Sequence, residues 1–297
     1  MKKRIDLHVH TTMSDGALSP KEVIDEAYKN GVTVISIADH DTTAAYNEEL
    51  FFYAKSKNIE LITAVEISTK LNKIGIHVLG YNFNLNNKQM QENLKKIRRA
   101  RHDYLDNVAK KLNNLGYYVD VKILEQIDAV TKAHIALNVI SNKQNATQLL
   151  NDFGYIPNKG EFIETIMNEN CPAYVKKETV TPKQAAEIIR QAGGKVVLAH
   201  PVAYIHEDNL TDNEILNIVK DMKPDGLETY YLYVDYNNNK INEIDKWNKF
   251  AIENHLFTTI GSDFHNKDGI RPEIGLINTN IILCEEEINK IIINLTN

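Results

Sequence analysis

Short apolar strands alternate with amphipathic helices in two stretches of this chain, and this alternation limits the fold more than any other feature of the sequence. The predicted strands lie at residues 5–7, 32–38, 61–65, 76–79, 195–199, 226–229 and 257–261. Helices are predicted between them, for example over residues 21–29, 43–57 and 237–254. Ser19 and Pro20 act as a cap and a helix-starting proline for the first of these helices. This pattern predicts an α/β fold with a parallel sheet or a barrel.

The alternation is interrupted between residues 88 and 170, where helix signals dominate. A long helix is predicted over residues 88–115 and ends before Gly116. Because strands and helices alternate again afterwards, we interpret this segment as an insertion into one large domain of a 297-residue chain. The expected organisation is a first part of the α/β domain at residues 1–85, a helical insertion at residues 86–173 and a second part at residues 174–297.

The balance of charges restricts the partners of the protein. The chain has 34 lysines and arginines against 40 aspartates and glutamates, so its formal net charge is −6. This balance disfavours a broad basic surface for duplex DNA, whereas a small anionic substrate remains compatible because a metal ion can reverse the charge locally. No apolar run approaches a membrane span or a signal peptide, and the two cysteines form no CxxC motif. We therefore expect a cytoplasmic protein without a membrane partner.

Histidines and carboxylates gather at the ends of the predicted strands. His8 and His10 follow the first strand with one residue between them, and Asp263 and His265 repeat this spacing after the last strand. The other members of the set are His40 after the second strand, Glu66 at the end of the third, His77 in the fourth and His200 after residues 195–199. Because the carboxyl ends of parallel strands meet at one face of a barrel, we expect these side chains to lie close together.

This set of side chains predicts a metal site. Imidazole and carboxylate ligands suit manganese, iron or zinc, and the lack of a thiolate disfavours a closed structural zinc site. The set contains more ligands than one ion can use, so we expect two or three divalent metal ions that share at least one carboxylate. His102, His206 and His255 lie outside this pattern and are expected to be ordinary surface or core residues.

The motifs around these residues resemble those of the PHP (polymerase and histidinol phosphatase) family. They are DLHVH at residues 6–10, SDG at 14–16, ADHD at 38–41, Glu66, His77, AHP at 199–201 and GSDFH at 261–265. The resemblance covers about residues 1–82 and 174–266. It implies a distorted (β/α)7 TIM-like barrel with an inserted, mainly helical small domain, and a trinuclear metal site.

The resemblance also assigns ligands to each ion. His8, His10, Glu66 and Asp263 would hold one ion, and Glu66 would bridge to a second ion held with His77 and His200. Asp15, His40 and His265 would hold the third. Asp15 enters this set through the resemblance alone, since its place in a Ser-Asp-Gly stretch also suits an ordinary turn residue.

Within the family, the chain looks most like the branch that removes the 3′-phosphate of nucleoside 3′,5′-bisphosphates and degrades short RNA from the 5′ end. In that branch the insertion acts as a substrate cap, which implies phosphate binding by Arg98, Arg101, Lys132 and His134. The chain departs from the branch in having Lys132 and Leu137 where the family has arginines. Lysine keeps the positive charge but loses the planar fork that pairs with a phosphate.

The expected activity is that of a metal-dependent phosphoric ester hydrolase, with attack by a metal-bound hydroxide on phosphorus. No serine or cysteine stands in a recognisable nucleophile motif. A histidinol-phosphate phosphatase shares the metal motifs, but the helical insertion disfavours it. An amidohydrolase would need a strand-end lysine that is not evident here. A non-catalytic regulatory module that binds metal is a further alternative, although such a module would be expected to lose ligands.

Overall fold

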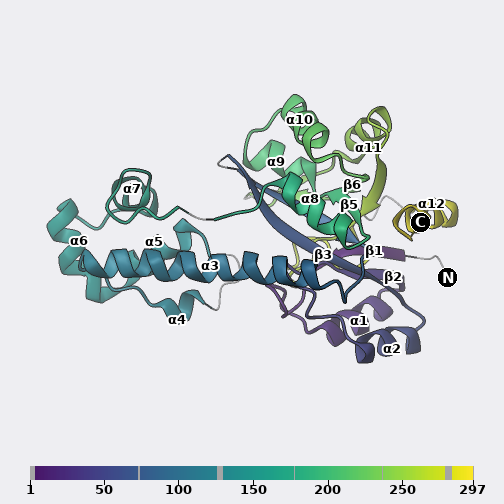
Figure 1. Ribbon diagram of the computed structural model, residues 1–297, viewed down its shortest axis with the longest axis horizontal. Helices are drawn as coiled ribbons and strands as arrows, with labels where there is room; N and C mark the ends of the chain where they lie inside the picture. Colours follow the sequence, from purple (N-terminus) through teal and green to yellow (C-terminus); the bar gives the residue numbers. More distant parts are fainter. Residues whose placement is uncertain are drawn as a thin grey trace. The chain divides into compact units, whose positions relative to one another are not determined.

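The computed structural model describes residues 4–72, 74–125, 130–176, 178–235, 237–277 and 283–296 (Figure 1). The chain forms two compact units. Unit 1 consists of Met1–Lys95 and Val180–Asn297, and unit 2 consists of Lys96–Thr179. Both limits of unit 2 lie further along the chain than the expected limits of the insertion, 86 and 173. Unit 2 starts inside helix α3 (Lys88–Asn114), whose first turns belong to unit 1.

A seven-stranded sheet forms the centre of unit 1, in the order β1-β2-β3-β4-β5-β6-β9. Its strands are β1 (Arg4–Val9), β2 (Val32–Ile37), β3 (Glu60–Leu71), β4 (Ile74–Tyr81), β5 (Lys195–Leu198), β6 (Gly226–Tyr230) and β9 (Phe257–Ile260). The strands β1, β2 and β3 pair in parallel, and so do β5, β6 and β9. The predicted α/β fold is therefore confirmed, and its central sheet is mostly parallel.

Strand β4 departs from the expected parallel arrangement, because it runs antiparallel to both β3 and β5. The strand β3 ends at Leu71 and β4 begins at Ile74, so the connection is too short for the crossover that a parallel pair requires. The strand β3 extends beyond Glu66 to make this pair. His77 lies opposite Ser68, two residues after Glu66, so the antiparallel strand still brings His77 to the same part of the sheet.

The segment after β9 runs beside the end of β1. Val9 and Phe264 form a parallel bridge, and the His10 N–H donates to the Phe264 carbonyl O at 2.9 Å. The Asp263 N–H donates to the His8 carbonyl O at 2.8 Å. Residues at opposite ends of the sequence are thereby held side by side by backbone hydrogen bonds.

Helices pack on the sheet of unit 1 (Figure 1). They are α1 (Pro20–Lys29), α2 (Glu48–Ser56), α8 (Pro182–Gln191), α9 (Pro201–Glu207), α10 (Asp212–Met222), α11 (Ile244–Glu253) and α12 (Glu285–Thr296). The strand β2 is buried on both faces, as its β-branched sequence predicts. Val34 belongs to an apolar cluster with residues of β1, β4, β5 and α12, whereas Ile35 and Ile37 pack in another with α1 and α2.

Two helices of unit 1 begin later than their sequences predict. The helix expected over residues 43–57 begins at Glu48, because the Asn47 side chain caps it by accepting the Leu50 N–H. The helix expected over residues 237–254 begins at Ile244. The residues before it form a small hairpin of β7 (Tyr233–Val234) and β8 (Lys240–Ile241), where the Asp235 side chain accepts two backbone N–H groups.

Among its described residues, unit 2 contains helices and no strand. Besides most of α3, it contains α4 (Val121–Leu124), α5 (Lys132–Ser141), η1 (Lys143–Asn145), α6 (Ala146–Phe153), α7 (Lys159–Phe162) and the π-helix η2 (Ile163–Met167). These elements share an apolar core of their own, in which Leu112, Ile135, Leu149 and Phe162 are fully buried. In the described part of the whole chain, no helix is both long and apolar enough to cross a membrane.

Candidate metal centre

The nine candidate ligands lie together in unit 1. They come from β1 (His8), the segment after it (His10 and Asp15), the end of β2 (His40), β3 (Glu66), β4 (His77), the end of β5 (His200) and the segment after β9 (Asp263 and His265). Six of the seven strands therefore present at least one of them. The structure places their nitrogen and oxygen atoms in overlapping groups.

Among the residues that the structure describes, three groups have ligand atoms that all lie within 4.8 Å of one another. The first contains His8, His10, Glu66 and Asp263, the second His10, Asp15, His40 and His265, and the third His40, Glu66 and His77. His200 approaches the third group, with its Nε2 3.2 Å from Glu66 Oε1 and 3.4 Å from His77 Nδ1. Compared with the expected grouping, the structure adds His10 to the Asp15 group and His40 to the Glu66 and His77 group.

Glu66 lies at the centre of this arrangement, and its two oxygens face different imidazoles. Oε2 is 3.3 Å from Nε2 of both His8 and His10, and 3.2 Å from His40 Nδ1. Oε1 is 3.1 Å from His77 Nδ1, besides its contact with His200. A carboxylate whose oxygens face separate sets of nitrogens is placed to bridge two cations.

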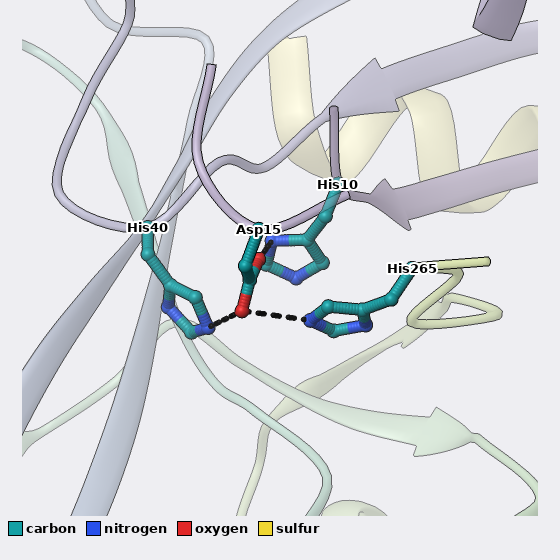
Figure 2. A group of neighbouring side chains, drawn as sticks. All are labelled: His10, Asp15, His40 and His265. Carbon is teal, nitrogen blue, oxygen red and sulfur yellow. Dashed lines mark ion pairs between the residues drawn. The ribbon is translucent and has the colours of Figure 1, made fainter. Parts of the chain in front are cut away.

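Asp15 occupies the space between three imidazoles (Figure 2). Its Oδ1 is 3.4 Å from His10 Nδ1, and its Oδ2 is 3.3 Å from His265 Nε2 and 3.7 Å from His40 Nε2. Gly16 permits this turn, because a Cβ at residue 16 would lie 2.3 Å from the His10 carbonyl O.

The buried side chain of Asp39 holds the turn that carries Asp15. Its carboxylate accepts hydrogen bonds from the Thr11 N–H at 2.7 Å, the Thr11 hydroxyl at 2.7 Å and the Ser14 hydroxyl at 2.6 Å. Asp39 was not among the predicted site residues, although its place beside His40 at the end of a predicted strand was a signal for it.

The charges of the site suit a cation. Burial alone would raise the pKa of Glu66, but the imidazoles of His77, His8 and His40 hold this pKa well below its usual range. Burial lowers the pKa of His40 well below its usual value, so its ring is neutral and keeps a free lone pair. Burial would also lower the pKa of His10, but the carboxylates of Asp263 and Glu66 raise it to about 10. The carboxylates that attract a proton to His10 would equally attract a metal ion in its place.

The spacing of the donor atoms also fits a metal ion. Bonds of about 2.1 Å at tetrahedral angles place neighbouring ligand atoms about 3.4 Å apart. In the first group, His8 Nε2 and His10 Nε2 are 3.1 Å apart, and they lie 3.4 Å and 3.1 Å from Asp263 Oδ1. Two imidazole nitrogens that converge on one point with two carboxylates require a shared proton or a cation between them.

Two of the candidate ligands have unusual backbone conformations. His200 has φ 24° and Asp263 has φ 52°, in the left-handed region that side chains other than glycine rarely adopt. Such conformations persist where the surrounding structure holds them, and they are concentrated at functional sites.

Two partners of the candidate ligands come from the end of β6, which presents none of the nine. Glu228 contacts His8 through its side chain, and the Tyr231 hydroxyl donates to Asp263 Oδ2 at 3.2 Å. Neither residue was among the predicted site residues. The signal for Glu228 was a carboxylate inside the predicted strand 226–229, where burial of a charge needs a specific partner.

The four predicted substrate-binding residues all lie in unit 2. Arg98 and Arg101 are on α3. The Lys132 Nζ donates to Asn168 Oδ1 at 3.0 Å and lies 5.7 Å from the centre of the Tyr174 ring. His134 completes a capping box at the start of α5, because its Nδ1 accepts the Thr131 N–H. Both side chains thus have partners within unit 2.

Known proteins resemble this chain over most of its length. Residues 6–191 match the PHP domain family. A 5′-3′ exoribonuclease of Haemophilus influenzae is 34% identical over 271 residues, which cover 89% of this chain and 91% of the relative. The 5′-3′ exoribonuclease Rnm of Escherichia coli is 30% identical, with coverage of 88% and 84%. A 3′,5′-nucleoside bisphosphate phosphatase of Chromobacterium violaceum is 25% identical, with coverage of 88% and 87%.

Solved structures resemble the chain in fold. A Bifidobacterium adolescentis protein described as a metal-dependent phosphoesterase superposes with a TM-score of 0.67 at 20% identity, covering 100% of this chain and 97% of its own. A Chromobacterium violaceum protein described as an amidohydrolase also superposes with a TM-score of 0.67, at 22% identity and with coverage of 98% and 97%. At these identities the similarity concerns the fold.

Proposed function

The chain belongs to the PHP domain family of phosphoesterases, and from this premise we propose that it hydrolyses phosphate monoesters of small nucleotides. The substrate class that we propose is the 3′-phosphate of nucleoside 3′,5′-bisphosphates, together with the 5′ ends of short RNA. Two relatives named exoribonucleases and one named a bisphosphate phosphatase support this choice. The observation that carries the proposal is the cluster of nine candidate ligands around Glu66.

We assign the cluster to two or three divalent ions of manganese, iron or zinc. The proposed ligands are His8, His10, Glu66 and Asp263 for one ion, Glu66, His77 and His200 for a second, and Asp15, His40 and His265 for a third. Divalent ions at these positions would lower the pKa of a bound water and neutralise charge on the phosphoryl oxygens. Glu66 and Asp263 contribute ionised oxygens, because the neighbouring imidazoles keep the pKa of each well below its usual range despite burial.

Recognition of a second phosphate is the role that we propose for four side chains of unit 2. They are Arg98, Arg101, Lys132 and His134. Arginine presents a planar fork of donors that matches two phosphate oxygens, whereas Lys132 offers one ammonium group. With leucine at residue 137, we expect weaker binding of the second phosphate than in relatives that have arginine there.

The proposal includes the finer description of the fold as a distorted (β/α)7 barrel. It is supported by the backbone hydrogen bonds between the end of β1 and the segment after β9, which are the first and last strands of the sheet. Such pairing would place the ends of all seven strands around one centre.

A panel of substrates tests the function. Protein stripped with a chelator is reconstituted with manganese, iron or zinc and is then given adenosine 3′,5′-bisphosphate, histidinol phosphate and a short 5′-phosphorylated RNA in parallel. We expect phosphate release from the bisphosphate and shortening of the RNA, both dependent on metal, and little release from histidinol phosphate. Undiminished activity in excess chelator, or no turnover of any phosphoester by metal-loaded protein, would refute the proposal.

A further inference from the structure

The strand β6 lies between β5 and β9 and presents no candidate ligand, yet it carries a buried carboxylate against the centre. Glu228 is 1% exposed. Its Oε1 lies 3.0 Å from His8 Nδ1, and its Oε2 accepts the backbone N–H of His200 at 3.0 Å. A buried carboxylate is tolerated only where donors compensate its charge, and here the donors belong to two candidate ligands.

The contact with His8 determines which ring nitrogen carries hydrogen. A carboxylate oxygen accepts hydrogen bonds, so the contact is satisfied when His8 Nδ1 donates to Glu228 Oε1. With hydrogen on Nδ1, Nε2 is the ring atom that can offer a lone pair to a cation, and it faces Glu66 Oε2 at 3.3 Å and Asp263 Oδ1 at 3.4 Å. A carboxylate that accepts from the far side of an imidazole is the usual outer partner of a metal-binding histidine.

The contact with His200 acts on the backbone. His200 has the left-handed φ of 24°, and the hydrogen bond from its N–H to Glu228 Oε2 helps to hold that conformation. The same conformation directs the ring so that Nε2 lies 3.2 Å from Glu66 Oε1. One carboxylate therefore supports two histidines from different strands.

Gly261 makes room for this arrangement. A Cβ at residue 261 would lie 2.3 Å from Glu228 Oε1 and 2.2 Å from the His8 Cβ. No side chain larger than glycine fits there without displacing either residue. The space that Glu228 and His8 occupy is thus a specific feature of the packing between β1, β6 and the end of β9.

We propose that Glu228 is a positioning residue that sets the metal affinity of two neighbouring positions, one through His8 and one through His200. The inference rests on the proposed metal-dependent function. The position formed by Asp15, His40 and His265 should be independent of Glu228, because no hydrogen bond or ion pair found among the described residues links Glu228 to any of these three side chains.

Glu228→Gln is the direct test, because glutamine keeps the shape but has a single acceptor oxygen. Its NH2 group must then face either His8 Nδ1 or the His200 N–H, where the wild-type protein has an acceptor oxygen. An NH2 directed at Nδ1 would favour hydrogen on Nε2, the atom that must face the ion. Manganese is titrated into the stripped protein by calorimetry, bound metal is counted by mass spectrometry, and anomalous diffraction from manganese-soaked crystals shows which positions are filled. We expect about 10- to 100-fold weaker binding at the His8 and His200 positions, with the Asp15 position retained.

Asp39→Asn is the matched control. Asp39 is also a carboxylate with 1% exposure, but its hydrogen bonds go to Thr11 and Ser14 in the turn that carries Asp15. This variant should show the reverse pattern, with the Asp15 position weakened and the other two retained. A purely structural role for Glu228 would instead lower the thermal midpoint of the metal-free protein and weaken all positions alike.

The wild-type protein provides a second measurement that does not depend on the folding of a variant. Nitrogen-15 NMR of the histidine rings should show hydrogen on Nδ1 of His8 in the metal-loaded protein. Hydrogen on Nε2, unchanged manganese affinity in Glu228→Gln, or uniform weakening of all positions would each overturn the inference.

The two proposals can fail separately. If Glu228→Gln binds manganese more weakly than the wild-type protein at the expected positions, but the wild-type protein hydrolyses none of the three test phosphoesters, the proposed function is wrong and the positioning role stands. If it hydrolyses them while Glu228→Gln binds manganese normally, the positioning role is wrong and the function stands. A wild-type protein that binds no manganese, iron or zinc would overturn both.

Discussion

Replacing Tyr46 by phenylalanine should destabilise the protein, because two buried backbone amides would lose their acceptor. The Tyr46 hydroxyl lies in a gap of the β2–β3 pairing, after the last regular pair at Ile37 and before the bridge between His40 and Glu66. It accepts the N–H groups of Ile37 at 2.9 Å and Ala64 at 2.8 Å, and it donates to the Ile37 carbonyl O at 2.7 Å. The hydroxyl thus links β2 and β3 by hydrogen bonds in the gap between their last regular pair and the bridge.

The magnitude follows from these contacts. A buried donor left without an acceptor costs about 1–3 kcal/mol, so two such amides should lower the free energy of unfolding by about 2–6 kcal/mol. His40 and Glu66 directly follow the gap, so we also expect weaker metal binding by the variant.

Urea unfolding followed by circular dichroism measures the effect, with comparison at equal m-value. The control is Tyr28→Phe, which removes the same hydroxyl from a tyrosine of α1 that is 56% exposed and should change the free energy of unfolding by less than about 0.5 kcal/mol. A loss in Tyr46→Phe no greater than in the control would refute the argument that this hydroxyl completes the pairing of β2 with β3.

Three further predictions concern the metal centre and the substrate. Asp15→Asn removes the charge that lies between three imidazoles, so we expect loss of one bound ion and a fall in kcat of about 100-fold or more, with an unchanged circular dichroism spectrum. The opposite result, full metal content with normal kcat, would exclude Asp15 from the site. In the metal-free protein, the carboxylates near His10 raise its pKa from 6.5 to about 10 against the effect of burial, so the proton that His10 binds on folding stabilises the protein fully below pH 6.5. The thermal midpoint should therefore fall as the pH rises from 6.5 to 10, and His10→Gln should flatten this part of the profile; an equally steep profile in the variant would contradict the assignment. Lys132→Arg restores the forked donor and should lower KM for adenosine 3′,5′-bisphosphate by up to about tenfold with little change in kcat, whereas Lys143→Arg, on the same unit, should leave KM unchanged. A KM in Lys132→Arg that equals the wild-type value would argue against phosphate binding at residue 132.

The positions of the candidate ligands along the chain could be predicted because they depend on local signals. The apolar runs that form β1, β2 and β5 are followed within three residues by His10, His40 and His200, and the place of a residue just after a strand is set by the strand itself. Once the strands are parallel neighbours, their carboxyl ends meet, so adjacency in space follows from position in sequence. The helices between residues 88 and 170 could equally be predicted, since they depend on periodicity and caps within the segment.

What only the tertiary structure decided is how distant groups meet. The antiparallel direction of β4 depends on hydrogen bonds with β3 and β5, and its apolar sequence suits either direction. The role of Glu228 depends on His8, which lies 220 residues away in the chain. The turn that carries Asp15 depends on Asp39, whose partners Thr11 and Ser14 come from another strand end. A sequence pattern reports how each segment prefers to fold, whereas which donor satisfies which buried carboxylate is settled only when the strands pack and exclude water from both.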